Sequence, residues 1–228
     1  MEDVNDKLIL SIDTSGRACS VAIGRGGRIY GSEYADTDMT MHSRTVMKMI
    51  DHVLTRTGRT TGDIDVFAAN VGPGSFTGVR IGICTAKGLA KAAEKKVFSA
   101  DALDALAIGA GVGAENICAM IDAGRGEAYY AFYQDGEKTV FDEAAPIEEI
   151  LRQINAPTVF AGDGAEVYRT IIEKYVEGAA YTRKNQTRAE DICILAAMAD
   201  ESRFTEPEQM SANYIRESGA VRKKCGDR

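Results

Sequence analysis

Residues 71–82 decide the fold of this chain, and they read Val71-Gly72-Pro73-Gly74-Ser75-Phe76-Thr77-Gly78-Val79-Arg80-Ile81-Gly82. The residues just before this loop, 64–71, are almost all apolar, as in a strand that is covered on both faces. The residues after it, 79–93, are helix formers and apolar residues without a proline. The stretch predicts a buried strand that turns through a glycine-rich loop into a helix. Its glycines bring backbone close to a ligand, a neighbouring helix or another chain.

The composition is that of an ordinary soluble globular protein. The 228 residues suffice for one large domain or two small ones, each with its own core. The net charge of −7 gives no basic surface that would neutralise a nucleic-acid backbone, so independent binding to nucleic acid is not expected. Residues 1–7 lack the regions of a signal peptide, and no window approaches about 18 apolar residues. We expect a cytoplasmic protein without membrane contact.

The cysteines, at positions 19, 84, 118, 193 and 225, form no CxxC pair. Four of them lie inside apolar runs and are expected to behave as reduced, small hydrophobic residues. Only Cys225, in the polar tail, is expected to be exposed.

The order of predicted elements in the first half of the chain returns in the second half. The first half predicts three antiparallel strands within 8–34, a helix at 43–57, the strand, loop and helix of 64–93, and a strand and helix at 96–110. The second half predicts three strands within 117–141, a helix at 146–154, a strand at 157–161, a glycine turn and a helix at 166–175. Thr187 and Glu190 form a capping box for a last helix that reaches about Arg203, and 205–228 has no clear periodicity.

This repetition predicts a duplicated α/β fold with mixed sheets. We expect one subdomain over 1–112 and a second over 113–228. Asp13 and Asp122 end equivalent strands, so the interface between the halves is expected to hold both aspartates and both glycine loops. In a duplicated fold, that cleft is the default functional site.

The glycine loop has two interpretations. It is not a Walker A loop, because Val79-Arg80 replaces the Lys-Ser/Thr pair, and it does not fit GxGxxG. A helix N-terminus with Ser75, Thr77 and Arg80 beside it could still hold an anion. Alternatively, the glycines only permit a tight turn and close packing.

Other polar residues are equally open to a structural interpretation. Asp13 and Asp122 either bind a metal or phosphate-associated water, or cap their own turns. His42 and His52 lie ten residues apart without neighbouring ligands, which nearly excludes a histidine metal site. No serine lies in a nucleophile-elbow motif, so a Ser-His-Asp triad is not expected.

The helix at 79–93 carries apolar side chains around most of its circumference. One face is expected to meet the sheet and another to meet something else. Gly82, Ala86 and Ala90, at intervals of four, would let a second helix approach closely. The alternative is burial within the monomer.

A family resemblance spans nearly the whole chain. The chain resembles the TsaB family, also called YeaZ, whose members take part in threonylcarbamoyladenosine modification of tRNA. The GPGSFTG-x-R-x-G motif at 72–82 is the specific signal. The weaker ones are 8–15, His42-Ser43, 86–90, Ile121-Asp122-Ala123, Gly126-Glu127-Ala128-Tyr129 and Tyr214-Ile215-Arg216.

The resemblance implies the actin-like ATPase fold, a duplicated ribonuclease-H-like architecture shared with sugar kinases. It implies action with a catalytic paralogue, TsaD, and a small ATPase, TsaE, in a complex that transfers a threonylcarbamoyl group to adenosine beside the anticodon. The paralogue has two metal-binding histidines four residues apart, and here Ala102 and Leu106 occupy those places. We therefore expect neither metal nor catalysis, nor protease activity, in this chain.

The resemblance also implies partner and ligand sites. Pairing of two copies, or of this chain with TsaD, is expected through the helices of the N-terminal half, with contacts from Val46, Met47, Ile50, Val79, Arg80, Ile83, Ala86 and Ala90. A weak site for ATP or ADP is expected at Asp13, Ser75, Thr77, Gly162 and Gly164, with no cofactor required. There are two departures from the family pattern, Ala212 in place of proline and residues 122–125, which lack the pattern of a phosphate loop and argue against ATP hydrolysis.

The functional hypothesis is a non-catalytic scaffolding subunit that reaches tRNA only through the complex. The alternative is a small actin-fold phosphotransferase that binds ATP between the halves. A nucleotide-binding dehydrogenase is disfavoured because neither glycine loop follows the first strand of the chain.

Overall fold

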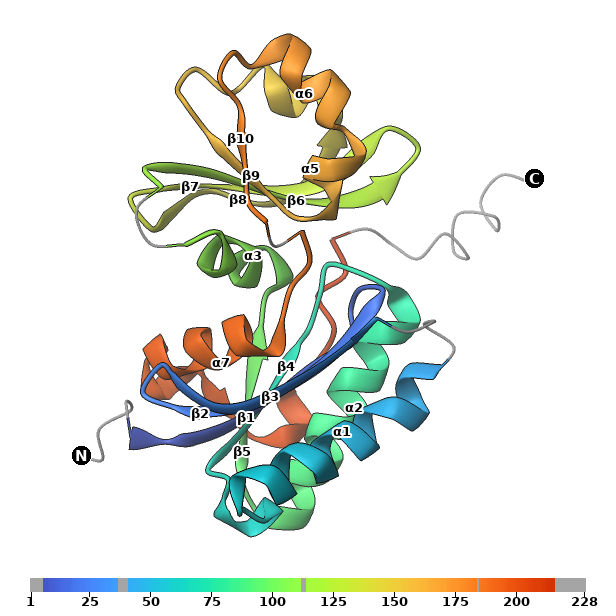
Figure 1. Ribbon diagram of the computed structural model, residues 1–228, viewed down its shortest axis with the longest axis vertical. Coiled ribbons are helices and arrows are strands. Elements are labelled where there is room, and N and C mark those ends of the chain that lie inside the picture. Colours follow the sequence, from blue (N-terminus) through green and yellow to red (C-terminus); the bar gives the residue numbers. More distant parts are fainter. Residues whose placement is uncertain (1–5, 37–40, 112–113, 184, 216–228) are drawn as a thin grey trace.

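A computed structural model describes residues 6–36, 41–111, 114–183 and 185–215, which form two lobes, each built on a mixed β-sheet (Figure 1). Over these residues the first lobe has a six-stranded sheet in the order β11-β5-β4-β1-β2-β3, and the second has a five-stranded sheet in the order β10-β9-β6-β7-β8. The strands of the first sheet are β1 (Leu8–Asp13), β2 (Ala18–Arg25), β3 (Arg28–Asp36), β4 (Val66–Asn70), β5 (Lys96–Ala100) and β11 (Phe204–Thr205). Those of the second are β6 (Asn116–Gly124), β7 (Glu127–Gln134), β8 (Glu137–Pro146), β9 (Val159–Ala161) and β10 (Ala180–Tyr181).

The predicted duplication is present in the strand pairing. In each lobe three consecutive strands pair antiparallel, and the first of them also pairs parallel with the fourth: β1 with β4, and β6 with β9. The fifth strand then adds parallel to the fourth in both lobes. All six residues of β1 are buried, as expected for a central strand with helices on both faces.

Helices cover both faces of the first sheet. On one face α1 (His42–Thr57) and α2 (Phe76–Ala93) lie side by side over a core that contains Leu10, Ile12 and Phe67. On the other face α7 (Ala189–Met198) packs on β1 and β2. In the second lobe α4 (Ile147–Leu151), α5 (Asp163–Val167) and α6 (Arg169–Tyr175) lie on one face of the sheet. Of the described helices, none combines the length and the apolar character that a bilayer crossing needs.

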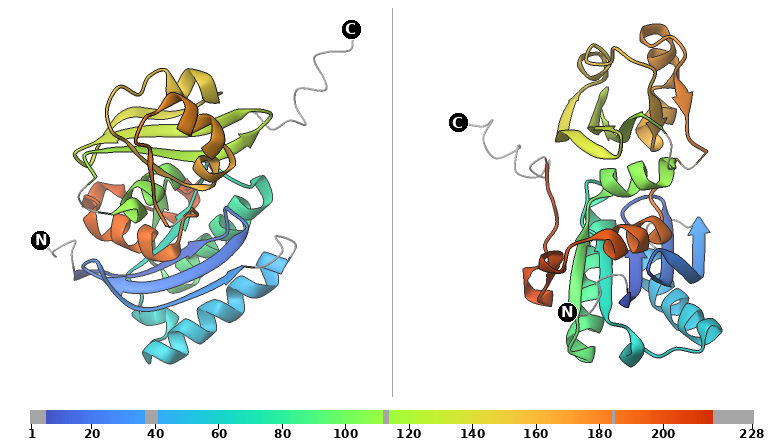
Figure 2. Two further views of the ribbon diagram at one scale, coloured as in Figure 1. Left: turned by 45° about the horizontal axis from the view of Figure 1, so that its top comes forward. Right: turned by 90° about the vertical axis from the view of Figure 1, so that its left-hand side faces the viewer.

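The C-terminal part of the chain returns to the first lobe, so the prediction that the second subdomain extends over all of 113–228 is wrong in its C-terminal part. After β10 the chain crosses back, places α7 on the first sheet and adds β11 antiparallel to β5 (Figures 1 and 2). The apolar face of α7 joins the core of the first lobe through Ile192, Cys193 and Ala196. The second lobe therefore ends near Tyr181.

Helix α3 (Ala102–Ala110) lies between the lobes and packs on both (Figure 2). Its Ala105 belongs to the core that α7 closes in the first lobe. Leu103 and Leu106 pack instead on the second sheet with Ala119 and Ala131. One short helix with two buried faces thus joins the two sheets.

Three local predictions need correction. The predicted capping box is absent. Arg188 precedes α7 without a side-chain cap, and the Thr187 hydroxyl donates a hydrogen bond to Asp13 instead. The single helix predicted at 166–175 is two short helices, α5 and α6, that meet at Tyr168. Cys84 lies in an apolar run but is exposed, because a different face of α2 packs on the sheet. Cys225 lies outside the described residues.

The glycine loop is explained by close packing of α2 on the end of β1. A Cβ atom on Gly78 would overlap the carbonyl oxygen of Thr14, and one on Gly74 would lie 2.8 Å from the carbonyl oxygen of Ser15. Gly72 has a φ of +108°, and a Cβ there would lie 2.9 Å from the backbone oxygen of Asn213. The backbone amide of Ser75 donates to the Ser15 carbonyl at 2.7 Å. The packing interpretation of the motif is therefore sufficient to explain these glycines.

Two glycines of α2 offer a matched test. Gly78→Ala is expected to lower the free energy of unfolding by more than about 2 kcal/mol, because the obstructing atom is backbone and cannot rotate away. Gly88 has open space around it, so Gly88→Ala is expected to raise that free energy by about 0.5–1 kcal/mol through helix propensity. Urea denaturation followed by circular dichroism measures both. Equal effects of the two substitutions would contradict the packing explanation.

Candidate functional site

A cleft of about 310 Å³ lies between the lobes, where the predicted interface of the halves was expected. One wall is the turn after β1 and the glycine loop, with Ser15, Arg17 and Ser75. The other wall is the end of β6 and the second glycine turn, with Asp122 and Asp163. The buried side chain of Leu106 on α3 and residues 185–187 complete the lining.

The polar side chains at the carboxyl ends of the strands cap their own turns. The Oδ1 atoms of Asp13, Asn70, Asp101 and Asp122 each accept a hydrogen bond from the backbone amide two residues later, at 2.9, 2.9, 2.8 and 2.9 Å. Both Asp13 and Asp122 thus cap their own turns, which is one of the two interpretations that their sequence positions allow. The same bond at the ends of β1 and β6 also reflects the duplication.

Asp13 lies beneath the cleft in a closed polar network. The Thr187 hydroxyl donates to its second carboxylate oxygen, Oδ2. Asn70 Nδ2 donates to Ser15 Oγ at 2.8 Å and lies 3.4 Å from Thr187 Oγ1. Asp13 is 2% exposed, and burial raises the pKa of its carboxyl group although these hydrogen bonds oppose the shift. The network ties β1, β4 and the chain before α7 together.

The structure does not bring the five predicted nucleotide-site residues together in the cleft. Ser75 lines it, but its Oγ accepts from the Gly78 amide at 3.2 Å and caps α2. Thr77 is exposed in the first turn of α2 and is not part of the lining. Gly162 and Gly164 pack on β6: a Cβ on Gly162 would overlap the Met120 carbonyl oxygen, and one on Gly164 would lie 3.1 Å from the Asp122 amide nitrogen. These glycines repeat the role of the first loop.

The charges in the cleft do not favour a phosphate chain. Among the described residues that line the cleft, Arg17 is the only cationic one, against the carboxyl groups of Asp122 and Asp163. Asp163 sits at the start of α5, where a phosphate loop would offer backbone amides to an anion. Its Oδ1 accepts from the Asp122 amide at 3.1 Å, and burial raises its pKa. A bound phosphate would therefore meet carboxyl groups on the wall of the second lobe.

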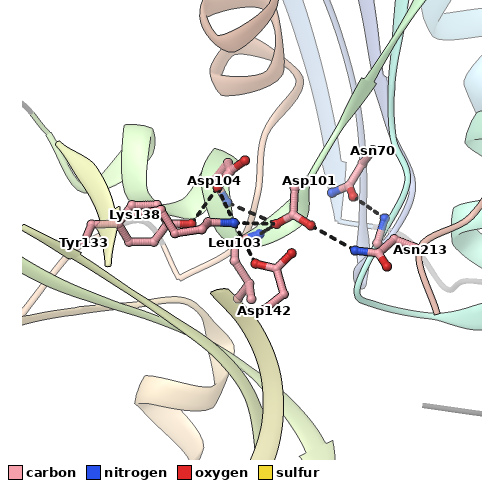
Figure 3. Close-up of polar contacts among 9 residues, drawn as sticks. Asn70, Asp101, Leu103, Asp104, Tyr133, Lys138, Asp142 and Asn213 are labelled. Carbon is pink, nitrogen blue, oxygen red and sulfur yellow. Dashed lines mark hydrogen bonds and ion pairs between the residues drawn. The ribbon is translucent and has the colours of Figure 1, made fainter. Parts of the chain in front are cut away.

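A polar junction beside the cleft, which the sequence analysis missed, joins three parts of the chain (Figure 3). Lys138 of β8 lies 2.6 Å from Asp104 of α3, 2.7 Å from Asp142 of β8 and 4.0 Å from Asp101. Asn213, in the C-terminal segment, donates through Nδ2 to Asp101 Oδ2 at 3.3 Å. No spacing in the sequence indicates this group, because it joins three segments that are far apart along the chain.

The junction carries more carboxyl groups than cations. Burial raises the pKa of Asp101 to about 7, and a hydrogen bond with Asp142 and the charge of that neighbour add to the shift, while Lys138 opposes it. Tyr133 also faces the junction and donates its hydroxyl to Asp104 at 2.7 Å. Asp101 thus holds a proton up to about neutral pH.

The predicted partner residues need correction. Six of the eight side chains are buried in the core of this chain, because they lie on the faces of α1 and α2 that pack against the first sheet. They are Val46, Ile50, Val79, Ile83, Ala86 and Ala90. Met47, 49% exposed, and Arg80 remain on the surface. For these six residues, burial within the monomer is therefore the right interpretation. They pack the two helices onto the first sheet.

The exposed side of α2 carries an aromatic cluster instead. Phe76 and Tyr214 have ring centroids 5.4 Å apart and are 43% and 46% exposed. The Arg80 guanidinium carbon lies 3.7 Å from the Phe76 ring centroid, and Arg80 Nε donates to the Tyr214 hydroxyl at 2.9 Å. Both aromatic residues belong to quoted family motifs, which was the signal that could have identified them.

The sheet order and the cleft define the class of the protein. The first five strands of the first sheet, β1 to β5, have the same topology as the five strands of the second sheet, and a cleft lies between the two lobes. This is the duplicated fold of actin-like ATPases and sugar kinases. A solved structure with this arrangement, (R)-2-hydroxyglutaryl-CoA dehydratase component A from Acidaminococcus fermentans, has a TM-score of 0.53 at 12% identity and covers 87% of this chain and 99% of that chain. This likeness concerns the fold alone.

Sequence comparison identifies the family within that class. The family described as "TsaD: tRNA N6-adenosine threonylcarbamoyltransferase" matches residues 38–223. The tRNA threonylcarbamoyladenosine biosynthesis protein TsaB of Escherichia coli K12 is 32% identical over 232 residues, which cover 96% of this chain and 98% of that protein. The structure of YeaZ from Pseudomonas aeruginosa has a TM-score of 0.79 at 32% identity and covers 91% of this chain and 99% of that chain. The chain belongs to the TsaB family.

The raised pKa of Asp101 predicts a pH dependence of stability. Between its ordinary value of 3.8 and about 7, the folded chain holds a proton that the unfolded chain has lost. The free energy of unfolding should therefore fall as pH rises through this window, by at most about 1.4 kcal/mol per pH unit from this group. Asp101→Asn can still cap α3 and donate to Asp142, so its profile should be flatter than that of the original chain. Urea denaturation from pH 5 to pH 8 measures this, with the exposed Asp51→Asn as control. An unchanged slope in Asp101→Asn would contradict the assignment.

Proposed function

We propose that this chain is a non-catalytic subunit of the complex that forms N6-threonylcarbamoyladenosine in tRNA. Family membership carries the proposal, since the Escherichia coli relative that matches almost end to end is named for this pathway. The matching family profile is named for the transferase itself, which supports a transferase of the same fold as the partner. The chain then binds and activates the catalytic subunit TsaD.

The absence of metal-ligand chemistry at the paralogue's positions supports a non-catalytic role. Ala102 is fully buried at the start of α3, and the buried Leu106 lines the cleft. Neither side chain can bind a metal ion. Because these two apolar residues take the places of the histidines, the catalytic metal belongs to the partner.

The remaining partners follow from the same proposal. The small ATPase TsaE joins the complex, and tRNA binds through the complex, since a chain of net charge −7 is poorly suited to hold RNA alone. The complex acts in the cytoplasm. The exposed sides of α1 and α2 form the partner surface, with Met47 and Arg80 on it, and two copies pair through the same surface in isolation.

The cleft takes a nucleotide only weakly, in keeping with the two carboxyl groups and the one cationic residue among its described lining. Calorimetry of the isolated chain with Mg-ATP should give no binding tighter than about 0.1 mM and no turnover. Asp163→Asn removes one charge from the wall and should strengthen any residual binding. Micromolar affinity with phosphoryl transfer by the isolated chain would favour the phosphotransferase instead.

Reconstitution tests the proposed function directly. The transferase, the ATPase, tRNA and threonylcarbamoyl-adenylate are combined with and without this chain, and modified adenosine is measured by mass spectrometry of nucleosides. Modification should require the chain, and Leu106→Ala, which changes an apolar wall without removing a catalytic group, should leave most of it. Equal modification without the chain would reject the proposal.

A further inference from the structure

Strand β8, at the edge of the second sheet, meets the start of α3 through polar side chains. Its apolar residues Val140 and Ala145 pack in the core of the second lobe. Its Lys138 and Asp142 reach instead to the carboxyl groups at the start of α3, as Figure 3 shows. A contact between titratable groups, unlike one between apolar side chains, depends on which of them hold a proton.

The junction has an excess of carboxyl groups in a place that water screens poorly. Lys138, the only cation among its described residues, lies 2.6 Å from Asp104 and 2.7 Å from Asp142, but 4.0 Å from Asp101. The side chains of Asp101, Lys138 and Asp142 are only 14%, 17% and 19% exposed. Asp101 and Asp142 are hydrogen-bonded to each other, which requires a proton between them. Without that proton, two carboxylates would face each other at low dielectric.

Asp101 can lose this proton near neutral pH, while Lys138 and Tyr133 keep theirs. Burial, the hydrogen bond and the charge of Asp142 raise the pKa of Asp101 to about 7, and the charge of Asp104 adds to the shift. Burial would lower the pKa of Lys138, but its hydrogen bonds with the two carboxyl groups outweigh burial and raise it. Burial also raises the pKa of Tyr133, whose hydroxyl faces the junction from β7.

The C-terminal segment, residues 206–215, stays on the first lobe through contacts outside the junction. The backbone amide of Asn213 donates to the Val71 carbonyl oxygen at 2.7 Å, and Lys91 of α2 pairs with Glu208 at 2.6 Å. The Asn213 side chain, which donates to Asp101, carries no charge. A change in the charge of the junction therefore acts on β8 and not on the seating of this segment.

We propose that the junction is a proton-dependent latch between the lobes: a proton shared by Asp101 and Asp142 holds β8 against the start of α3, and its transfer to water releases β8. Leu103 and Leu106 keep the second sheet packed on α3, so the motion is a pivot of the second lobe about this helix. The walls of the cleft come from both lobes, and the width of the cleft then depends on pH.

The direction of the pH dependence follows from the two states of Asp101. In the released state its carboxyl group faces water and ionises near the ordinary pKa value of 3.8, whereas in the latched state the pKa is about 7. Between these values the latched chain binds the extra proton. The ratio of released to latched chains should therefore rise about tenfold per pH unit and become constant above about pH 7.

Distances between spin labels, measured by double electron–electron resonance, test this in the full chain. Cys84 is exposed on α2 of the first lobe, and Phe141→Cys adds a second label site on β8, where the side chain is 74% exposed. The three other described cysteines are buried, and Cys225→Ser removes the remaining one. A second distance between the two labels should be absent at pH 5 and grow toward pH 8.

Two variants and one label pair serve as matched controls. Asp101→Asn and Asp142→Asn each replace the shared proton by a permanent N–H donor, so both should keep the pH 5 distances at pH 8. Met47→Cys paired with Cys84 places both labels on the first lobe, and this distance should not change with pH. Thermal unfolding checks that each variant folds, and one folded Asn variant suffices.

Three results would overturn the inference: the same distances from pH 5 to pH 8, a pH response that persists in the folded Asn variants, or an equal change in the control pair on the first lobe. None of them bears on the proposed function, which does not depend on this latch.

Discussion

The close approach of helix α2 to the end of strand β1 is the contact on which the rest of the structure depends. The helix backbone at Gly78 lies against the Thr14 carbonyl, and the Thr14 hydroxyl donates to the Gly78 carbonyl oxygen at 2.7 Å. This contact fixes which stripe of α2 meets the sheet and which faces outward. It also positions Ser75 on the wall of the cleft. A motif that resembles a phosphate-binding loop is thus accounted for by packing.

The cleft lies between the lobes, where a nucleotide site is expected in this fold, but several of its polar groups are hydrogen-bonded to the protein itself. Asp13 and Asp122 bond to their own turns, and the second glycine turn packs on Met120 in the way that the first packs on Thr14. With Leu106 in its lining and two carboxyl groups on one wall, the cleft is a poor place for phosphate chemistry. The outer side of α1 and α2 is therefore the surface with the stronger argument for function.

The sequence predicted what depends on neighbouring residues and missed what depends on distant ones. The duplication, the glycine turn and the bounds of α3 were predicted because strand and helix periodicity is local. The return of 189–215 to the first lobe was not, since an apolar helix face in the sequence does not show which of two sheets it covers. Helix α2 is apolar on most sides, so Ala86 and Ala90 were assigned to a partner although the sheet buries them. The junction of Asp101, Lys138, Asp142 and Asn213 brings together three segments that are far apart in the sequence.

The central claim is that this chain meets its partner through the outer side of α1 and α2 together with the C-terminal segment, and not through the cleft. Hydrogen exchange of the chain with and without the transferase subunit, read by mass spectrometry of peptides, tests it most directly. We predict slower exchange in residues 42–57, 76–93 and 206–215, with no change in strands β7 and β8. Slower exchange confined to the cleft turns at 14–17 and 122–125, or to the second lobe, would contradict it.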